Sequence, residues 1–146
     1  MHKIIQKAET NNAPKAIGPY SQAVVAGPFL FISGQLPIEP KSGKILVESI
    51  EDQTEQVISN IEAILNSKGL TLENVVKMEV FLKDLRDFQG MNAVYAKRLS
   101  HSVKPARHAF EVAELPMDAR VEISCTAFDG GHSCQTKTSG SNTAGT

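Results

Sequence analysis

The sequence has no excess of charge of either sign and very little cysteine. Its 15 basic and 16 acidic residues give a formal net charge of −1, so no positive surplus drives binding to a phosphate backbone, and nucleic acid is not indicated as a partner. The two cysteines, Cys125 and Cys134, form no CxxC pair and provide no disulfide framework. A chain of 146 residues needs no such framework, because one domain of this size buries a sufficient core.

Long apolar runs are also missing. The chain contains no stretch of about 18 consecutive apolar residues that would cross a membrane. Its first residues, MHKIIQKAETNNAP, have neither the apolar centre of a secretory signal nor the Arg-rich, acid-poor composition of an organelle-import sequence. The expected compartment is therefore the cytoplasm, with no membrane partner.

The motifs of several enzyme classes are absent. The histidines, at positions 2, 101, 108 and 132, do not have metal-ligand spacing, and His132 with Cys134 makes only a weak pair of ligands. No Gly-rich phosphate loop or dinucleotide fingerprint is present, and Ser33-Gly34 does not form the nucleophile elbow of a hydrolase. We therefore expect no metal and no organic cofactor.

Composition divides the chain into two parts. Residues 129–146 are rich in Gly, Ser and Thr and contain no aliphatic residue larger than alanine. Such a segment cannot bury enough apolar surface to offset the entropy of ordering it. We predict a single domain over residues 1–128, followed by a flexible tail over residues 129–146.

Within the domain, two-residue alternation and short apolar runs predict strands, and helical periodicity predicts helices. In chain order the expected elements are a strand near 3–6, a hairpin around Gly27-Pro28, a helix over 50–68, a strand over 75–82, a helix over 88–100 and a hairpin around 115–118. The first helix begins after a capping residue, Ser49, and ends before Gly69. This order is typical of an α+β domain with both helices on one face of a sheet.

The predicted strand over 75–82 has one apolar and one mixed face. Val76, Met78, Val80 and Leu82 form the apolar face, and Val75, Lys77, Glu79 and Phe81 form the mixed face. A sheet face that mixes charged and apolar side chains meets either water or a partner. We therefore expect this side of the sheet to pack against another subunit.

Arg107 and Glu122 stand at nearly equal distances from the tip of the last predicted hairpin. Antiparallel pairing of its two arms would bring their side chains opposite or diagonal to each other. One interpretation is a structural ion pair, which is the more common arrangement on spacing alone. The other is that Arg107 binds a substrate carboxylate while Glu122 positions or deprotonates a water molecule. His108 alternates out of phase with Arg107 and is expected on the opposite face.

Four blocks of the sequence carry a resemblance to a known family. AIGPYSQAV, FISGQLP, DLRDFQGMNAVY and KPARHAFEVAELPMDARVEISCTA, in this order, resemble the RidA family, also called the YjgF family, over about residues 3–128. The resemblance implies a chorismate-mutase-like α+β fold with a mixed sheet, assembled as a homotrimer with sites between subunits. It also implies hydrolysis of 2-imino acids, such as 2-iminobutanoate and 2-iminopropanoate, to 2-keto acids and ammonia without a cofactor. Such imines are released by pyridoxal-phosphate enzymes and damage other enzymes of that kind.

Residue by residue, the resemblance assigns Arg107 to the substrate carboxylate and Glu122 to the attacking water. It also implies a pocket completed by Tyr20, Ser33, Gly34, Asn92 and the backbone of Ala109. Many relatives carry a second glutamate at the position of Ser124, which shares the predicted face of Glu122. Because a like charge is missing there, we expect a lowered pKa for Glu122.

Two other functions remain open at this point. The family has also been described as an endoribonuclease, although this chain has neither a surplus of positive charge nor a His/Lys arrangement suited to RNA cleavage. The other alternative is a non-catalytic trimer that binds keto or imino acids or protects unfolded proteins. The presence of both Arg107 and Glu122 favours the deaminase, since a carboxylate receptor does not need the glutamate.

Overall fold

The computed structural model describes residues 4–131. Most of the predicted tail, including His132 and Cys134, lies outside the described residues. The elements in chain order are β1 (Ile5–Ala8), β2 (Ala23–Ala26), β3 (Phe29–Gln35), α1 (Ile50–Asn66), β4 (Val75–Leu82), α2 (Phe88–Arg98), β5 (Ala106–Glu111) and β6 (Val121–Phe128). Short 3₁₀ turns precede β4, α2 and β6.

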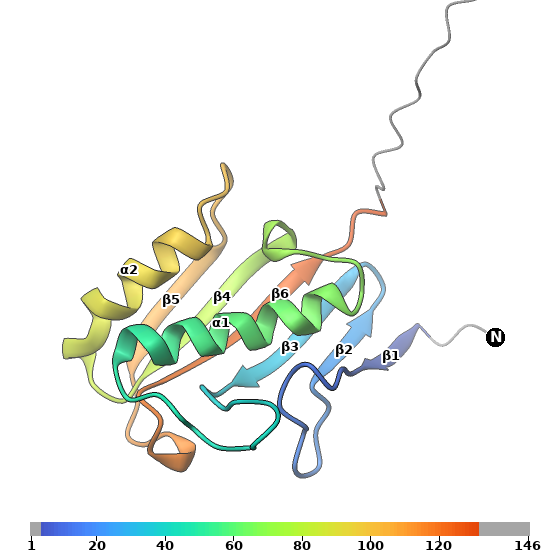
Figure 1. The fold of residues 1–146 in the computed structure, drawn as a ribbon. Helices are drawn as coiled ribbons and strands as arrows, with labels where there is room; N and C mark the ends of the chain where they lie inside the picture. Colours follow the sequence, from blue (N-terminus) through green and yellow to red (C-terminus); the bar gives the residue numbers. More distant parts are fainter. Residues whose placement is uncertain (1–3, 132–146) are drawn as a thin grey trace, which may run out of the picture.

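The strands form one mixed sheet in the order β1-β2-β3-β6-β4-β5. All neighbouring strands are antiparallel except β4 and β5, which are parallel and are connected through α2. Both helices lie on the same face of the sheet (Figure 1), with α1 packed against β3 and β6 and also against α2. The predicted α+β architecture with two helices on one face is confirmed. We call the opposite side of the sheet the open face.

Helix α1 forms where local signals predict it. The Ser49 hydroxyl accepts a hydrogen bond of 3.1 Å from the amide of Asp52, a cap of the kind that contributes about 1 kcal/mol. At the other end the chain turns through Gly69, whose φ is 70°, and the amide of Leu70 donates to the carbonyl of Leu65. The predicted range of 50–68 therefore differs from the observed helix only in its last turn.

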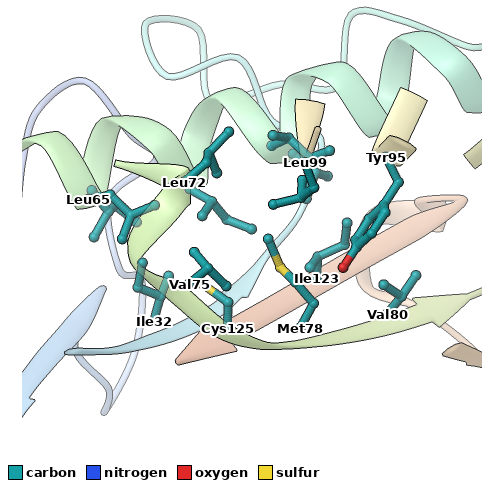
Figure 2. Packing of buried hydrophobic residues seen from close by; sticks show 14 of the residues in the cluster. Ile32, Leu65, Leu72, Val75, Met78, Val80, Tyr95, Leu99, Ile123 and Cys125 are labelled. Carbon is teal, nitrogen blue, oxygen red and sulfur yellow. The ribbon is translucent and has the colours of Figure 1, made fainter. Parts of the chain in front are cut away.

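The core lies between α1, α2 and the middle strands. Figure 2 shows the side chains of Met78 and Val80 from β4 beside Ile123 from β6, below residues of the helical layer. These three side chains have no exposed surface. Each buried side chain of this size contributes about 1.5–3 kcal/mol relative to its exposed state. Their burial holds β4 and β6 side by side in the interior of the sheet.

A β-bulge near the start of β4 changes which face of the sheet its first residues occupy. Val75 is buried against the core, whereas Val76 is 44% exposed. The register between β4 and β6 shifts between Val75 and Lys77, so one extra residue is inserted there. The predictions that Val76 belongs to the apolar face and Val75 to the mixed face are therefore wrong, while Met78, Val80 and Leu82 lie on the apolar face as expected.

The predicted hairpin around residues 115–118 is also wrong. Strands β5 and β6 are not neighbours, because β4 lies between them and pairs with both. Burial explains this order: β6 alternates between buried and half-buried side chains, as a central strand does, whereas the side chains of β5 are mostly exposed, as at an edge. The connection between them turns through Met117 and Asp118, both at φ 57°.

Candidate functional site

Arg107 lies near the start of β5 and points to the helical face of the sheet. It is aligned with Met78 of β4, and paired residues of neighbouring strands point to the same side. Its guanidinium carbon is 4.6 Å from the ring centroid of Tyr95 and 5.5 Å from that of Phe88. One Nη atom donates a 2.7 Å hydrogen bond to Oδ1 of Asn92. Two cation–π contacts and one hydrogen bond therefore hold the guanidinium in place.

The three supporting side chains come from one stripe of α2. Phe88, Asn92 and Tyr95 are four and three residues apart, which is the spacing of neighbours on a helix surface. The sequence resemblance identified Asn92, whereas Phe88 and Tyr95 lie in the predicted helix over 88–100 and were not identified as site residues. Their contact with Arg107 depends on β5 lying beside β4, which the predicted hairpin did not include.

The guanidinium of Arg107 has no acidic partner within residues 4–131, where the ion pairs involve other side chains. An arginine has five N–H donors in a planar fork. Only one side chain of the described part of the chain, that of Asn92, accepts from it. The fork is thus held in position with donors available for a planar anion such as a carboxylate.

An ion pair fixes the start of α2. Arg120 donates through Nε and Nη2 to the two carboxylate oxygens of Asp87, at 3.0 and 2.7 Å. Asp87 is the residue directly before α2, and Arg120 lies two positions before Glu122. No motif in the sequence indicated this pair. It joins the helix that supports Arg107 to the strand that carries Glu122.

Glu122 lies on the open face of the sheet, against Gly34. A Cβ atom at position 34 would stand 2.5 Å from Oε1 and 2.9 Å from Cδ of Glu122, so only glycine leaves room for this carboxylate. Gly34 belongs to an irregular part of β3, where the register with β6 shifts between Ile32 and Gln35. Burial raises the pKa of Glu122 above its usual value.

Tyr20 and Ser33 surround the same end of β3. The Ser33 hydroxyl donates a 2.6 Å hydrogen bond to the carbonyl of Ser21, and the hydroxyl of Tyr20 accepts one of 3.3 Å from the amide of Ile17. The ring of Tyr20 is largely exposed and borders the same small hollow as Gly34. Tyr20, Ser33, Gly34 and Glu122 therefore form one group, which we call the glutamate group.

The arginine group, defined as Arg107, Asn92 and Ala109, is separate from the glutamate group. Arg107 of β5 is aligned with Met78 of β4, and Glu122 of β6 is aligned with Phe81 of β4. Met78 and Phe81 are three residues apart, and β5 and β6 lie on either side of β4. With about 3.3 Å per residue and about 4.8 Å between strands, their Cα atoms are on the order of 14 Å apart. The two side chains also point to opposite faces, so the predicted cross-strand contact between them does not form within one chain.

Ala109 and His108 lie on opposite faces of β5. Ala109 is aligned with Val80 and is partly buried against the core, on the same side as Arg107. His108 stacks on Phe110 with a centroid distance of 5.1 Å and lies 6.2 Å from the ring of Phe81, both on the open face. The prediction that His108 and Arg107 lie on opposite faces is confirmed.

Ser124 has a partner on the neighbouring strand. Its hydroxyl donates a 2.9 Å hydrogen bond to Oε2 of Glu79, and this bond is the main cause of a lowered pKa for Glu79, with a smaller effect from Lys77. The missing second glutamate does not bring the pKa of Glu122 below its usual value, because burial raises it. The sequence did not indicate Glu79 as a site residue, although the alternation of β4 placed it on the mixed face, which is the open face of the sheet.

The described residues offer no cluster of metal ligands. Within residues 4–131, no three histidine, cysteine, aspartate or glutamate side chains gather into a group that would hold a metal ion. Cys125 is buried, and burial raises the pKa of its thiol to about 12. No helix of residues 4–131 is long and apolar enough to cross a membrane.

Comparison with known proteins identifies the family. The family model described as "Endoribonuclease L-PSP" matches residues 10–129 of this chain. Reactive Intermediate Deaminase A, chloroplastic, of Arabidopsis thaliana is 47% identical over 118 residues, which cover 81% of this chain and 63% of the plant protein. The chain belongs to the RidA family. A RutC family protein of Pyrococcus horikoshii is 56% identical over 119 residues, covering 82% of this chain and 94% of the archaeal protein.

The RidA-family fold is confirmed by solved structures. The crystal structure of Escherichia coli TdcF with bound serine superimposes with a TM-score of 0.80 at 38% sequence identity, covering 84% of this chain and 98% of TdcF. The α+β, chorismate-mutase-like fold that the sequence resemblance implied is therefore the fold of this chain.

Proposed function

We propose that this chain hydrolyses reactive 2-imino acids, such as 2-iminobutanoate and 2-iminopropanoate, to 2-keto acids and ammonia. The observation that carries the proposal is the guanidinium of Arg107, held by Phe88, Tyr95 and Asn92 without an acidic partner in the described chain. Such a fork selects α-imino acids over simple imines, because only the former have a carboxylate next to the reacting carbon.

The chemistry needs orientation and a water molecule. A protonated imine is already electrophilic, so the protein has only to align it and deliver water. Glu122 accepts a proton from the water as the new C–O bond forms at the imine carbon. Glu122 then returns this proton to the nitrogen of the carbinolamine, and the C–N bond breaks. The departing ammonia takes the hydroxyl proton and becomes ammonium, which leaves the 2-keto acid. No metal or organic cofactor takes part in the proposed reaction.

The remaining residues have supporting roles in this mechanism. Asn92 positions the guanidinium through its 2.7 Å hydrogen bond, and Gly34 leaves the space that the Glu122 carboxylate occupies. Tyr20 and Ser33 form the wall beside Gly34, and Ala109 contributes its backbone next to Arg107. The bound serine of TdcF supports a substrate of this class, since serine is a small molecule with a carboxylate next to the carbon that carries nitrogen.

We further propose that the active assembly is a homotrimer with its sites between subunits. The arginine group and the glutamate group face opposite sides of the sheet and do not meet within one chain. The open face also exposes phenylalanines that a monomer would leave in water: Phe31 is 47% exposed and Phe110 is 45% exposed. In the proposed trimer a neighbouring copy covers this face, and its Arg107 forms one site together with the Glu122 of the first.

A coupled assay tests the proposed activity. Threonine dehydratase releases 2-iminobutanoate, and semicarbazide traps the imine as a semicarbazone. The chain should suppress semicarbazone formation, and Arg107→Ala should not. Arg107→Lys keeps the charge but loses the two-pronged geometry, so a large loss is expected there as well. Full activity of Arg107→Lys would contradict the carboxylate-binding role.

Mixing two inactive variants tests the position of the site. When Arg107→Ala and Glu122→Gln chains are refolded together, random assembly gives about a quarter of the intersubunit sites both intact residues. Recovery of about a quarter of the wild-type rate is expected. If mixing restores nothing although mixed oligomers form, then both residues act within one chain and the intersubunit site is wrong.

Protection of pyridoxal-phosphate enzymes in the cytoplasm is the proposed biological role. The family model's description names an endoribonuclease, and RNA cleavage is therefore the competing function. Incubating the same variants with RNA separates the two. Cleavage that is sensitive to salt, survives Glu122→Gln and is lost with surface lysines would replace the deaminase proposal.

A further inference from the structure

A groove lies along the loop before β2 and is bordered by Tyr20 of the glutamate group. Its volume is about 470 Å³, and it is lined by Lys7, Glu9, Thr10, Asn11, Lys15, Ala16, Tyr20, Ser21 and Gln22. A smaller hollow of about 50 Å³ adjoins it and includes Gly34, the residue against which Glu122 packs. Lys15, Ala16, Tyr20 and Gln22 border both spaces, so the two lie side by side.

The loop that carries Lys15 is held by a buried side chain. Gln22 is only 4% exposed, and its amide nitrogen donates to the carbonyls of Pro14 at 2.7 Å and Thr10 at 3.0 Å. Its amide oxygen accepts from the backbone N–H of Thr10 at 2.8 Å. Because Pro14 directly precedes Lys15, the backbone of the lysine is fixed relative to Tyr20 and the hollow beyond it.

Lys15 is the cation of this groove that is not neutralised. Lys7 is paired with Glu9 at 3.4 Å, and these two charges largely cancel. Lys15 forms no ion pair among residues 4–131 and its side chain is exposed. The groove therefore has a net positive charge, located on the side that also borders the hollow at Gly34.

The two spaces differ in size, so each suits a different part of a substrate: the hollow suits the reacting end, and the groove suits the far end. A hollow of about 50 Å³ holds one or two groups the size of a water molecule, which occupies about 30 Å³ in the liquid. The groove beyond it is far larger than the methyl or ethyl group of the smallest 2-imino acids. A longer side chain would leave the hollow past Tyr20 and end near the ammonium group of Lys15.

We propose that Lys15 is a specificity-determining residue that binds a second carboxylate, so that the site also accepts 2-imino and 2-keto dicarboxylic acids. This inference rests on the proposed function for the position of the reacting carbon near Glu122. The α-carboxylate is bound by Arg107, the reacting carbon lies beside Glu122, and the distal carboxylate meets Lys15. Three contacts of this kind distinguish a dicarboxylic from a monocarboxylic substrate of equal length.

Binding of two stable 2-keto acids tests the inference without turnover. 2-Oxoglutarate and 2-oxopentanoate have the same number of carbons and differ only in the terminal carboxylate. Dissociation constants are measured by calorimetry for the wild-type chain, for Lys15→Met, and for Lys41→Met, a control that removes one exposed charge elsewhere. The wild type should bind 2-oxoglutarate about threefold to fivefold more tightly, as a solvent-exposed ion contact allows.

Lys15→Met should remove this preference and Lys41→Met should keep it. The preference should also shrink at about 1 M salt, where the screening length falls to ~3 Å. A wild-type chain that binds both acids equally, or a preference that survives in Lys15→Met, would overturn the inference. Turnover is scored separately with 2-iminopropanoate. A Lys15-dependent preference in a chain that does not hydrolyse the imine would refute the deaminase and leave the dicarboxylate site in place.

Discussion

Replacing Gly34 by alanine should reduce activity while leaving the fold intact. The added Cβ would stand 2.5 Å from Oε1 of Glu122, whereas an ordinary contact between these atoms begins at about 3.4 Å. The carboxylate oxygen therefore has to move by about 0.9 Å, the difference between the two distances. A displacement of about 1 Å in a catalytic group lowers a rate by up to about 100-fold, so we expect kcat/KM to fall by ~10- to 100-fold.

The same substitution should change stability little. The backbone of Gly34 is not in the left-handed region, so alanine adds no backbone strain there. The atoms it crowds, Oε1, Cδ and Cγ at 2.5, 2.9 and 3.2 Å, belong to the flexible side chain of Glu122 and not to the backbone, so a change of rotamer can relieve the contact. Loss of the glycine also lowers the entropy of the unfolded chain, a gain of about 0.4–1 kcal/mol that offsets the crowding.

Gly27→Ala is the matched control for this prediction. A Cβ at Gly27 meets no atom within 4 Å, but its φ of 57° is strained for alanine. We expect the opposite result, a loss of about 1 kcal/mol in stability with unchanged activity. The assay combines semicarbazone trapping with thermal denaturation of both variants. If Gly34→Ala keeps the full rate, the position of the Glu122 carboxylate does not control the reaction and its catalytic role is refuted.

Three more outcomes follow from burial. The hydroxyl of Tyr95 is buried and has no hydrogen-bond partner among residues 4–131, so Tyr95→Phe should keep or raise the stability by up to about 1 kcal/mol in denaturant titration. A marked loss would mean that a partner exists. Since the pKa of Cys125 is raised to about 12, its thiol should resist iodoacetamide at neutral pH in a Cys134→Ser background until the chain unfolds. Rapid alkylation of the folded chain would contradict this. Burial raises the pKa of Glu122, and the reaction uses its charged form, so kcat/KM should rise with pH through a pKa above 4.5. A rise in kcat/KM with a pKa below 4.5 would count against Glu122 as the base.

The helices and the bounds of β4 could be predicted from sequence because their signals are local. A capping hydroxyl at Ser49, a glycine at position 69 and a helical stripe of apolar residues lie within one segment, and together they determine α1. The range 75–82 of β4 follows likewise from its two-residue alternation. The bulge at Val76 could not be seen in this pattern, since it is defined by the register with another strand.

The candidate residues were visible in the sequence, but their arrangement was not. Arg107 and Glu122 were found through motif and resemblance, and the local pattern suggested that they meet across a hairpin. Only the tertiary structure decided that β4 separates their strands and that the two side chains face opposite sides of the sheet. The contacts of Arg107 with Phe88 and Tyr95 follow from the same arrangement.

The physical reason is that strand order depends on burial over the whole sheet. Alternation tells which residues of a strand share a face, but it does not tell which strand lies beside it. The more apolar β6 takes a central position against β3 and β4, and the exposed β5 remains at the edge. Sequence alone therefore determined the elements and the chemistry of the candidate residues, and the packing of the sheet determined that these residues form two groups on opposite faces.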